Sequence, residues 1–99
     1  MKRFYALIRK LRKAYPQFTV QVRRKPQADF GHTWQLDEDQ RFRITIRKDL
    51  NEDAAIDTLI HEWAHVPSYE EWERTGVEHN PVWAYHQGEC YRIYEEHFL

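Results

Sequence analysis

Residues 51–66 have the sequence NEDAAIDTLIHEWAHV, which predicts the helix around which the rest of the chain is organised. Apolar residues recur in it at spacings of three and four, as they do when a helix buries one stripe of side chains. The expected stripe consists of Ile56, Leu59, Ile60 and Trp63. Asp49 or Asn51 can cap the start of this helix, and Pro67 ends it because proline cannot donate a helical hydrogen bond.

The same helix contains the motif H-E-x-x-H at His61, Glu62 and His65. Residues four apart lie on one helical face, so both imidazoles can bind the same metal ion. Glu62 is rotated by about 100° from His61, which lets its carboxylate reach a metal-bound water without being a ligand. Zinc lowers the pKa of its bound water to about 7, and a carboxylate that accepts the proton acts as a general base. The motif therefore predicts one Zn²⁺ per chain and a hydrolytic reaction.

A catalytic zinc ion needs a third protein ligand and keeps its fourth position for water. The candidates in this sequence are His79, His86, Glu89, His97 and His32. His79 is favoured because it directly precedes Asn80-Pro81, which is a strong helix start. The loop over residues 66–78 is long enough to bring His79 back over the first two ligands, and long loops in small domains are often functional.

The residues before the motif predict one helix and three strands. Residues 2–14 repeat apolar side chains at helical spacing, whereas the alternation over residues 18–22 is typical of a half-buried strand. The alternating runs 32–36 and 41–47 flank the polar link 37–40 and predict a β-hairpin.

After the motif, the sequence predicts one helical turn and one long helix. Ser68 and Glu71 have the spacing of a capping box, and Gly76 suits a helix C-terminus. The last helix begins at Asn80-Pro81. The expected fold is therefore α+β: a helix, a three-stranded antiparallel sheet, the active-site helix, a loop and a C-terminal helix. The 99 residues have room for a single domain, 1–99.

Composition favours a soluble, cytoplasmic protein. The hydrophobic content is 41% and charged residues make up 31%, as in globular chains. No apolar run approaches the length of a membrane span, so no membrane partner is expected. Cys90 is the only cysteine, which excludes an internal disulfide and suits a reducing compartment.

Charge is distributed unevenly along the chain. Residues 1–48 contain 13 Lys and Arg against 4 Asp and Glu, whereas residues 49–99 contain 2 against 12. A basic half can bind phosphate groups, and the alternation of the strands places four arginines on one open sheet face. These are Arg23, Arg41, Arg43 and Arg47. They predict a nucleic-acid face; the alternative is a solvated face whose charge discourages edge pairing.

Two segments together resemble the SprT-like metalloprotease family, and most of all its short phage-encoded or bacterial forms. They are LIHEWAH at residues 59–65 and HNPVW at residues 79–83, and the resemblance extends over about residues 56–94. It implies a zincin-like minimal domain in which the two motif histidines and His79 bind zinc and Glu62 is the general base. Members of this family include proteases that degrade proteins crosslinked to DNA.

Three functions stay open at this point. The first is a zinc-dependent endopeptidase whose substrate lies extended along an edge strand, for which residues 42–47 are the candidate by resemblance. The candidate oxyanion stabilisers are Tyr69, Tyr85 and His86. The second is a nucleic-acid-binding module with a structural zinc ion, closed by Glu89 or His86 as fourth ligand. The third is a minimal gluzincin-like protease in which Glu89 replaces His79 as a ligand.

Overall fold

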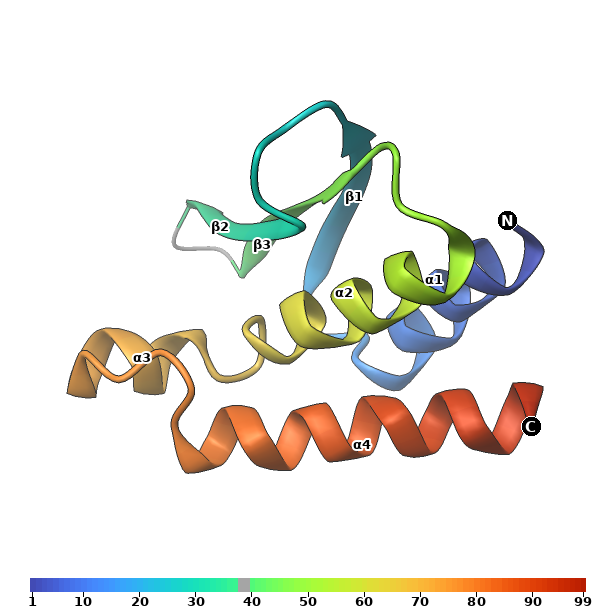
Figure 1. The fold of residues 1–99 in the computed structure, drawn as a ribbon. Coiled ribbons are helices and arrows are strands. Elements are labelled where there is room, and N and C mark those ends of the chain that lie inside the picture. The colour runs from blue at the N-terminus through green and yellow to red at the C-terminus, as the bar shows by residue number, and fades with distance from the viewer. Residues whose placement is uncertain (38–39) are drawn as a thin grey trace.

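The chain folds, in a computed structural model that describes residues 1–37 and 40–99, into four helices and a three-stranded sheet (Figure 1). The elements are α1 (Lys2–Ala14), β1 (Thr19–Lys25), β2 (Gly31–Asp37), β3 (Arg41–Arg47), α2 (Glu52–Ala64), α3 (Tyr69–Thr75) and α4 (Pro81–Phe98). The predicted hairpin link at 37–40 includes residues 38–39, which lie outside the described residues. Among the described residues, no helix is long and apolar enough to cross a membrane.

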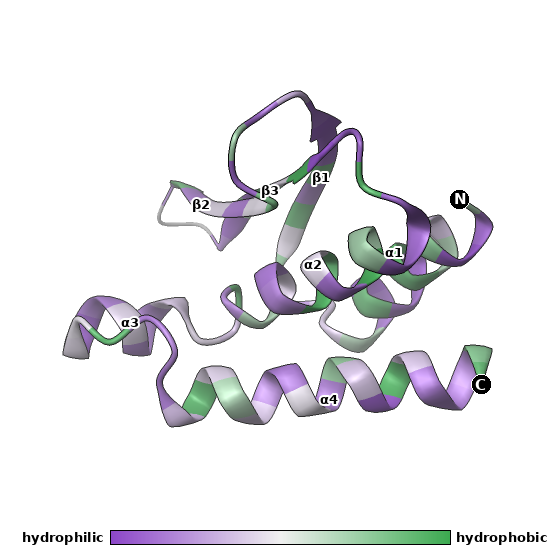
Figure 2. Ribbon diagram, viewed as in Figure 1, coloured by the Kyte–Doolittle hydropathy of each residue, from purple (hydrophilic) through white to green (hydrophobic). Residues whose placement is uncertain are grey.

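The elements form three layers, with α2 in the middle (Figure 1). The sheet lies on one side of the layer made by α1 and α2, and α4 lies on the other side. Helix α2 contacts β2, β3, α1 and α4. Figure 2 shows that α3, in contrast, is almost entirely hydrophilic, and none of its residues is buried. Helix α2 is therefore the central packing element of the domain, whereas α3 lies at its periphery.

The sheet is mixed, so the prediction of a fully antiparallel sheet is wrong. The strand order is β1-β3-β2, with β1 parallel to β3 and β2 antiparallel to β3. The chain crosses from β1 to the far edge before it forms the hairpin, so β3 returns between the two earlier strands. Burial agrees with the order: β3 has the most buried residues of the three strands, and the central strand is flanked by a neighbouring strand along each edge. The predicted edge strand at residues 42–47 is consequently the central strand, and β1 and β2 are the two edges.

The predicted apolar stripes form one continuous core. Phe4, Leu7, Ile8, Leu11, Val20, Phe42, Ile44, Ile46, Ile56, Leu59, Ile60 and Trp63 are all buried in it. From α4, Cys90 and Tyr94 complete the core on the far side of α2. The stripe of α2 is thus covered by the sheet, α1 and α4, which leaves its remaining face for polar residues.

The start of α1 is held by α2 rather than by its own cap. The Glu52 carboxylate accepts hydrogen bonds from the backbone N–H groups of Arg3 and Phe4, at 3.1 and 3.4 Å, where a helix presents its partial positive charge. The Arg3 side chain also binds Glu52 and Asp53 and donates to the Tyr94 hydroxyl at 2.7 Å. One arginine therefore joins α1, α2 and α4 at the end of the molecule opposite to α3.

The segment between α2 and α4 contains the short helical piece expected between Ser68 and Gly76, as the seven residues of α3. Helix α3 ends at Gly76, whose φ of 72° is left-handed, as expected for a glycine C-cap. The predicted capping box is wrong, because the Ser68 hydroxyl donates back to the Ala64 carbonyl at 2.7 Å and makes no cap at the start of α3. The predicted cap of α4 is confirmed, since the Asn80 side chain accepts from the Trp83 N–H at 2.9 Å.

Truncation of Leu59 is expected to destabilise the domain by about 3 kcal/mol, because its fully buried side chain would leave a cavity between α2 and its neighbours. The exposed Leu36 on β2 provides a matched control, and Leu36→Ala is expected to change stability by less than about 0.5 kcal/mol. Urea unfolding of both variants measures the difference. Equal losses would contradict the assignment of α2 as the central packing element.

Candidate metal centre

The first two histidines of the site lie one turn apart at the end of α2. His61 is partly exposed, His65 is 2% exposed, and their ring centroids are 5.2 Å apart. Both lie off the apolar stripe that contains Trp63, because residues four apart share a face and Trp63 lies between them on another. The packing of α2 therefore determines where its two imidazoles point.

The third histidine, His79, reaches the site from the segment that joins α3 to α4. Asn80 holds this segment on both sides: its side chain donates to the Val77 carbonyl and accepts from the Trp83 N–H, each at 2.9 Å. The ring centroid of His79 then lies 4.9 Å from that of His61 and 5.2 Å from that of His65. Among the described residues, this is the histidine that completes a group able to hold a metal ion.

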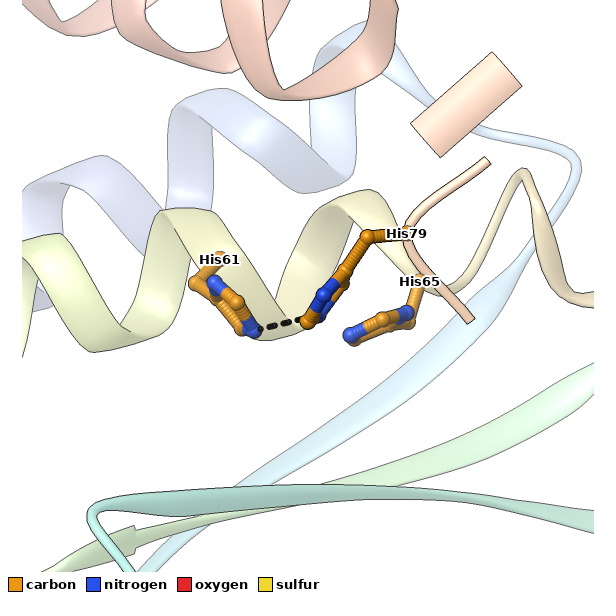
Figure 3. A group of neighbouring side chains, drawn as sticks. All are labelled: His61, His65 and His79. Atoms are coloured by element: carbon orange, nitrogen blue, oxygen red, sulfur yellow. Dashed lines mark hydrogen bonds between the residues drawn. The ribbon is translucent and has the colours of Figure 1, made fainter. Parts of the chain in front are cut away.

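The three imidazoles converge on one another on the side of α2 that faces the sheet (Figure 3). One ligand nitrogen from each ring lies within 4.8 Å of the others, and the Nε2 atoms of His61 and His79 are 3.2 Å apart. Tetrahedral zinc with bonds of about 2.0–2.1 Å holds its nitrogen ligands about 3.3–3.4 Å apart. Both ring nitrogens of His65 are buried without a hydrogen-bond partner in the described structure. A bound metal ion would give one of these nitrogens a partner. The three histidines therefore fit a zinc ion.

Electrostatics keep these rings ready to bind a cation. Burial, together with the charges of the neighbouring histidines, lowers the pKa of His65 to about 4. Burial also lowers the pKa of His61, with a contribution from His79. Neutral imidazole is the form that binds metal, so few protons have to leave these two rings at neutral pH.

Two tryptophan rings pack against the histidines. The sequence analysis did not predict either contact. The Trp83 ring lies 4.5 to 5.8 Å from all three imidazoles, and its Nε1–H donates to the His61 carbonyl at 3.1 Å. The Trp72 ring lies 5.3 Å from His65. Trp83 follows His79 by four residues, but its contact with α2 depends on how α4 packs, and no local pattern encodes that.

Glu62 is 8% exposed and faces β2, in a small hollow that it shares with His65. The Thr33 hydroxyl lies 2.8 Å from its Oε1 atom and 3.0 Å from its backbone carbonyl. Gly31 makes this approach possible, because a Cβ atom there would lie 2.7 Å from Glu62 Cγ and 2.6 Å from Thr58 Cγ2. The sequence analysis did not identify Gly31 or Thr33 as site residues. The one available signal concerned Thr33, because a polar residue on the inward face of a strand needs a hydrogen-bond partner.

Burial raises the pKa of the Glu62 carboxyl to about 7. The Thr33 hydrogen bond opposes this shift, whereas the negative charges of Glu78 and Asp29 add to it. Glu78 lies 3.7 Å from the His65 ring and is 53% exposed. The carboxylate and His65 line a small hollow of about 60 Å³. A carboxyl that ionises near neutral pH, beside a space of water size, can both accept and return a proton.

The alternative ligands lie elsewhere. Glu89 pairs with Arg92, and His86 Nδ1 is 2.9 Å from the Tyr15 hydroxyl on the α1 side of α4. His97 is in the last turn of α4. Only His32 comes close, since it lines the hollow beside Glu62, but it does not belong to the three-histidine group.

The candidate oxyanion stabilisers are also separated. Tyr85 and His86 line a different hollow, with Tyr15 and Glu89. Tyr69 is nearer to the site, because its ring lies 5.4 Å from that of Trp72, which in turn contacts His65.

The four arginines of the predicted nucleic-acid face do share the outer face of the sheet, as alternation requires. Arg41 forms an ion pair with Asp37, and Arg47 pairs with Asp49 at 2.7 Å. The Arg43 side chain donates to Gln21 at 3.3 Å. The face also presents Trp34, 41% exposed, with its ring 4.1 Å from that of His32.

No protein-family model matches this chain, and comparisons with curated proteins and with solved structures return no significant match. The interpretation of the site therefore depends on its own geometry.

Replacement of His79 by alanine is expected to weaken zinc binding by more than about 100-fold, since it removes one of three ligands. Wild-type protein at a zinc concentration of 100 times Kd should gain about 2.7 kcal/mol of stability, which chelation removes. Glu89→Ala is the matched control and should bind as wild type. Zinc content by mass spectrometry and thermal unfolding measure both. Loss of zinc in Glu89→Ala instead would favour the gluzincin-like set.

The metal-free protein is expected to lose stability relative to a His65→Asn variant as the pH falls from about 6.5 to about 4. The unfolded chain takes up a proton at His65 in this window and the folded chain does not, so acid favours unfolding. Glu62 acts in the opposite sense, because its folded pKa is raised, but it is present in both proteins. Urea unfolding with a chelator across this window gives the difference. A difference independent of pH would mean that His65 is not buried in its neutral form.

Proposed function

We propose that this chain is a zinc-dependent endopeptidase with a zincin-like domain, in which Glu62 is the general base. The observation that carries the proposal is the pairing of three converging imidazoles with a buried carboxylate whose pKa is near 7. Zinc bound by three histidines would polarise a peptide carbonyl and acidify a water molecule. The similarity of residues 59–65 and 79–83 to SprT-like metalloproteases points to the same reaction.

Glu62 would move the proton in this reaction. Its carboxylate accepts the proton of the attacking water and returns it to the leaving amine, and a pKa near 7 suits both transfers. Thr33 holds the Oε1 atom at 2.8 Å, which fixes the carboxylate and leaves the other oxygen for the transfer. Gly31 keeps β2 close enough for that contact.

The substrate chain would lie along β2. This strand is an edge of the sheet, and Gly31 and Thr33 on it border the hollow that contains Glu62. An extended peptide can pair with an exposed strand edge through backbone hydrogen bonds. The peptide bond to be cleaved would then lie between β2 and the three histidines.

Nucleic acid is a second proposed partner, which would direct the protease to DNA-associated proteins. The outer sheet face combines the exposed Trp34 with Arg23 and Arg43, and bases stack on aromatic rings while arginines bind the phosphates. Arg41 and Arg47 would contribute less because each is already paired with an aspartate.

The Glu62→Gln variant is expected to retain one zinc per chain but to lose peptide cleavage by at least about 100-fold, because glutamine cannot accept the proton. Cleavage of a casein or DNA-bound protein substrate by the zinc-loaded protein, followed by mass spectrometry of the fragments, measures this. Glu95→Gln, on the exposed surface of α4, is the matched control. Full activity of Glu62→Gln would remove Glu62 from the mechanism.

A further inference from the structure

A larger hollow of about 470 Å³ lies beside the metal centre, between the sheet and α3. It is lined by Phe18, Gln35, Gln40, Phe42, Val66, Pro67, Tyr69, Glu70 and Glu73. Its size is within the range of about 300–1,000 Å³ that is usual for binding sites. None of the expected site residues except Tyr69 belongs to it.

The hollow continues the substrate path proposed along β2. Thr33 and Gln35 are neighbours on the inward face of this strand, about 7 Å apart along it. The first binds Glu62, and the second lines the hollow. A chain of ring contacts also joins the two places: the Tyr69 ring lies 5.4 Å from Trp72, which lies 5.3 Å from His65. A peptide residue within a few positions of the cleaved bond can therefore place its side chain in the hollow.

The lining combines aromatic rings with negative charge. The Phe42 ring lies 5.8 Å from Phe18 and 5.4 Å from Tyr69. Phe42 itself is only 2% exposed, so the accessible aromatic surface of the hollow belongs mainly to the half-buried Phe18 and Tyr69. Glu70 and Glu73 are both exposed on α3 at this hollow. Among the described residues, neither has a cationic partner at ion-pair distance, and the only arginine of α3, Arg74, pairs with Glu71.

We infer that this hollow binds a lysine or arginine side chain of the peptide substrate. The inference rests on the proposed endopeptidase function and adds to it a substrate class, peptides with a basic residue near the cleaved bond. The hydrocarbon stem lies against Phe18 and Tyr69, as the stems of long basic side chains do on apolar surfaces. The cationic head binds Glu70 and Glu73 through charge-assisted hydrogen bonds.

Other side chains fit this lining less well. An acidic side chain would be repelled by the two carboxylates, and a purely apolar one would gain no charge interaction with them. An aromatic ring beside the bound cation adds a favourable cation–π contact, which Tyr69 supplies. The negative charges of Glu78 and Asp29 near Glu62 act in the same direction along the path.

The test measures binding without turnover. Zinc-loaded Glu62→Gln protein is titrated into labelled decapeptides of Gly, Ala and Ser in which one lysine is moved through successive positions. Matched sets contain norleucine, which has the same stem without the charge, or glutamate. We expect that lysine or arginine at one position improves Kd about tenfold over norleucine, and that Glu70→Gln/Glu73→Gln abolishes this ratio. Glu95→Gln/Glu96→Gln makes the same change in charge on α4 and should leave the ratio unchanged.

The inference is overturned if lysine never exceeds norleucine, or if the preference survives in the Glu70→Gln/Glu73→Gln variant. Survival there would assign the preference to Glu78 and Asp29. Cleavage of the lysine peptide by zinc-loaded wild-type protein tests the proposed function separately. Selective binding without cleavage would support the proposed binding site for a basic side chain and contradict the endopeptidase function. Cleavage without selectivity would support the endopeptidase function and contradict the binding site.

Discussion

The close contact between α2 and β2 is the constraint on which the site depends. Gly31 has no side chain, so β2 comes near enough for the Thr33 hydroxyl to reach both the backbone carbonyl and the carboxylate of Glu62. An ionisable group buried in this way needs a hydrogen-bond partner, and Thr33 supplies one. The same contact makes β2 one wall of the small hollow that Glu62 shares with His65, so the position of one edge strand determines the surroundings of the carboxylate.

The remaining parts hold that contact in place from the other side. Helix α2 is covered by α1, α4 and β3, and its fully buried Leu59, Ile60 and Trp63 prevent it from rotating about its axis. Helix α4 contributes twice, because Asn80 orients the segment with His79 and Trp83 packs against all three imidazoles. A domain of 99 residues thereby brings three histidines together from a single helix and one returning segment. Helix α3 has no buried residue, and the hollow near the three histidines lies between this helix and the sheet.

Local patterns in the sequence were sufficient for the helices and for the candidate ligands. The spacing of His61 and His65 follows from helix geometry, and Asn80-Pro81 marks a helix start just after His79, so short-range rules identified the pair and favoured His79 among the candidates for the third position. The sheet topology did not follow, because alternation identifies strands but not their neighbours. The antiparallel prediction assumed that consecutive strands pair, whereas burial of Phe42, Ile44 and Ile46 puts β3 in the centre. Thr33, Gly31 and Trp83 were missed for the same reason, since each acts on a residue at least 22 positions away.

The sequence by itself determined the chemistry that is available: two imidazoles one helical turn apart, a carboxylate beside them, and a third histidine before a capped helix. These features depend on covalent geometry and on backbone hydrogen bonding within a few residues. Only the tertiary structure decided which histidine joins the pair, which strand borders it, and that burial raises the pKa of Glu62 to about 7. Those properties depend on which surfaces exclude water from one another, and exclusion of water depends on contacts between residues far apart in the chain.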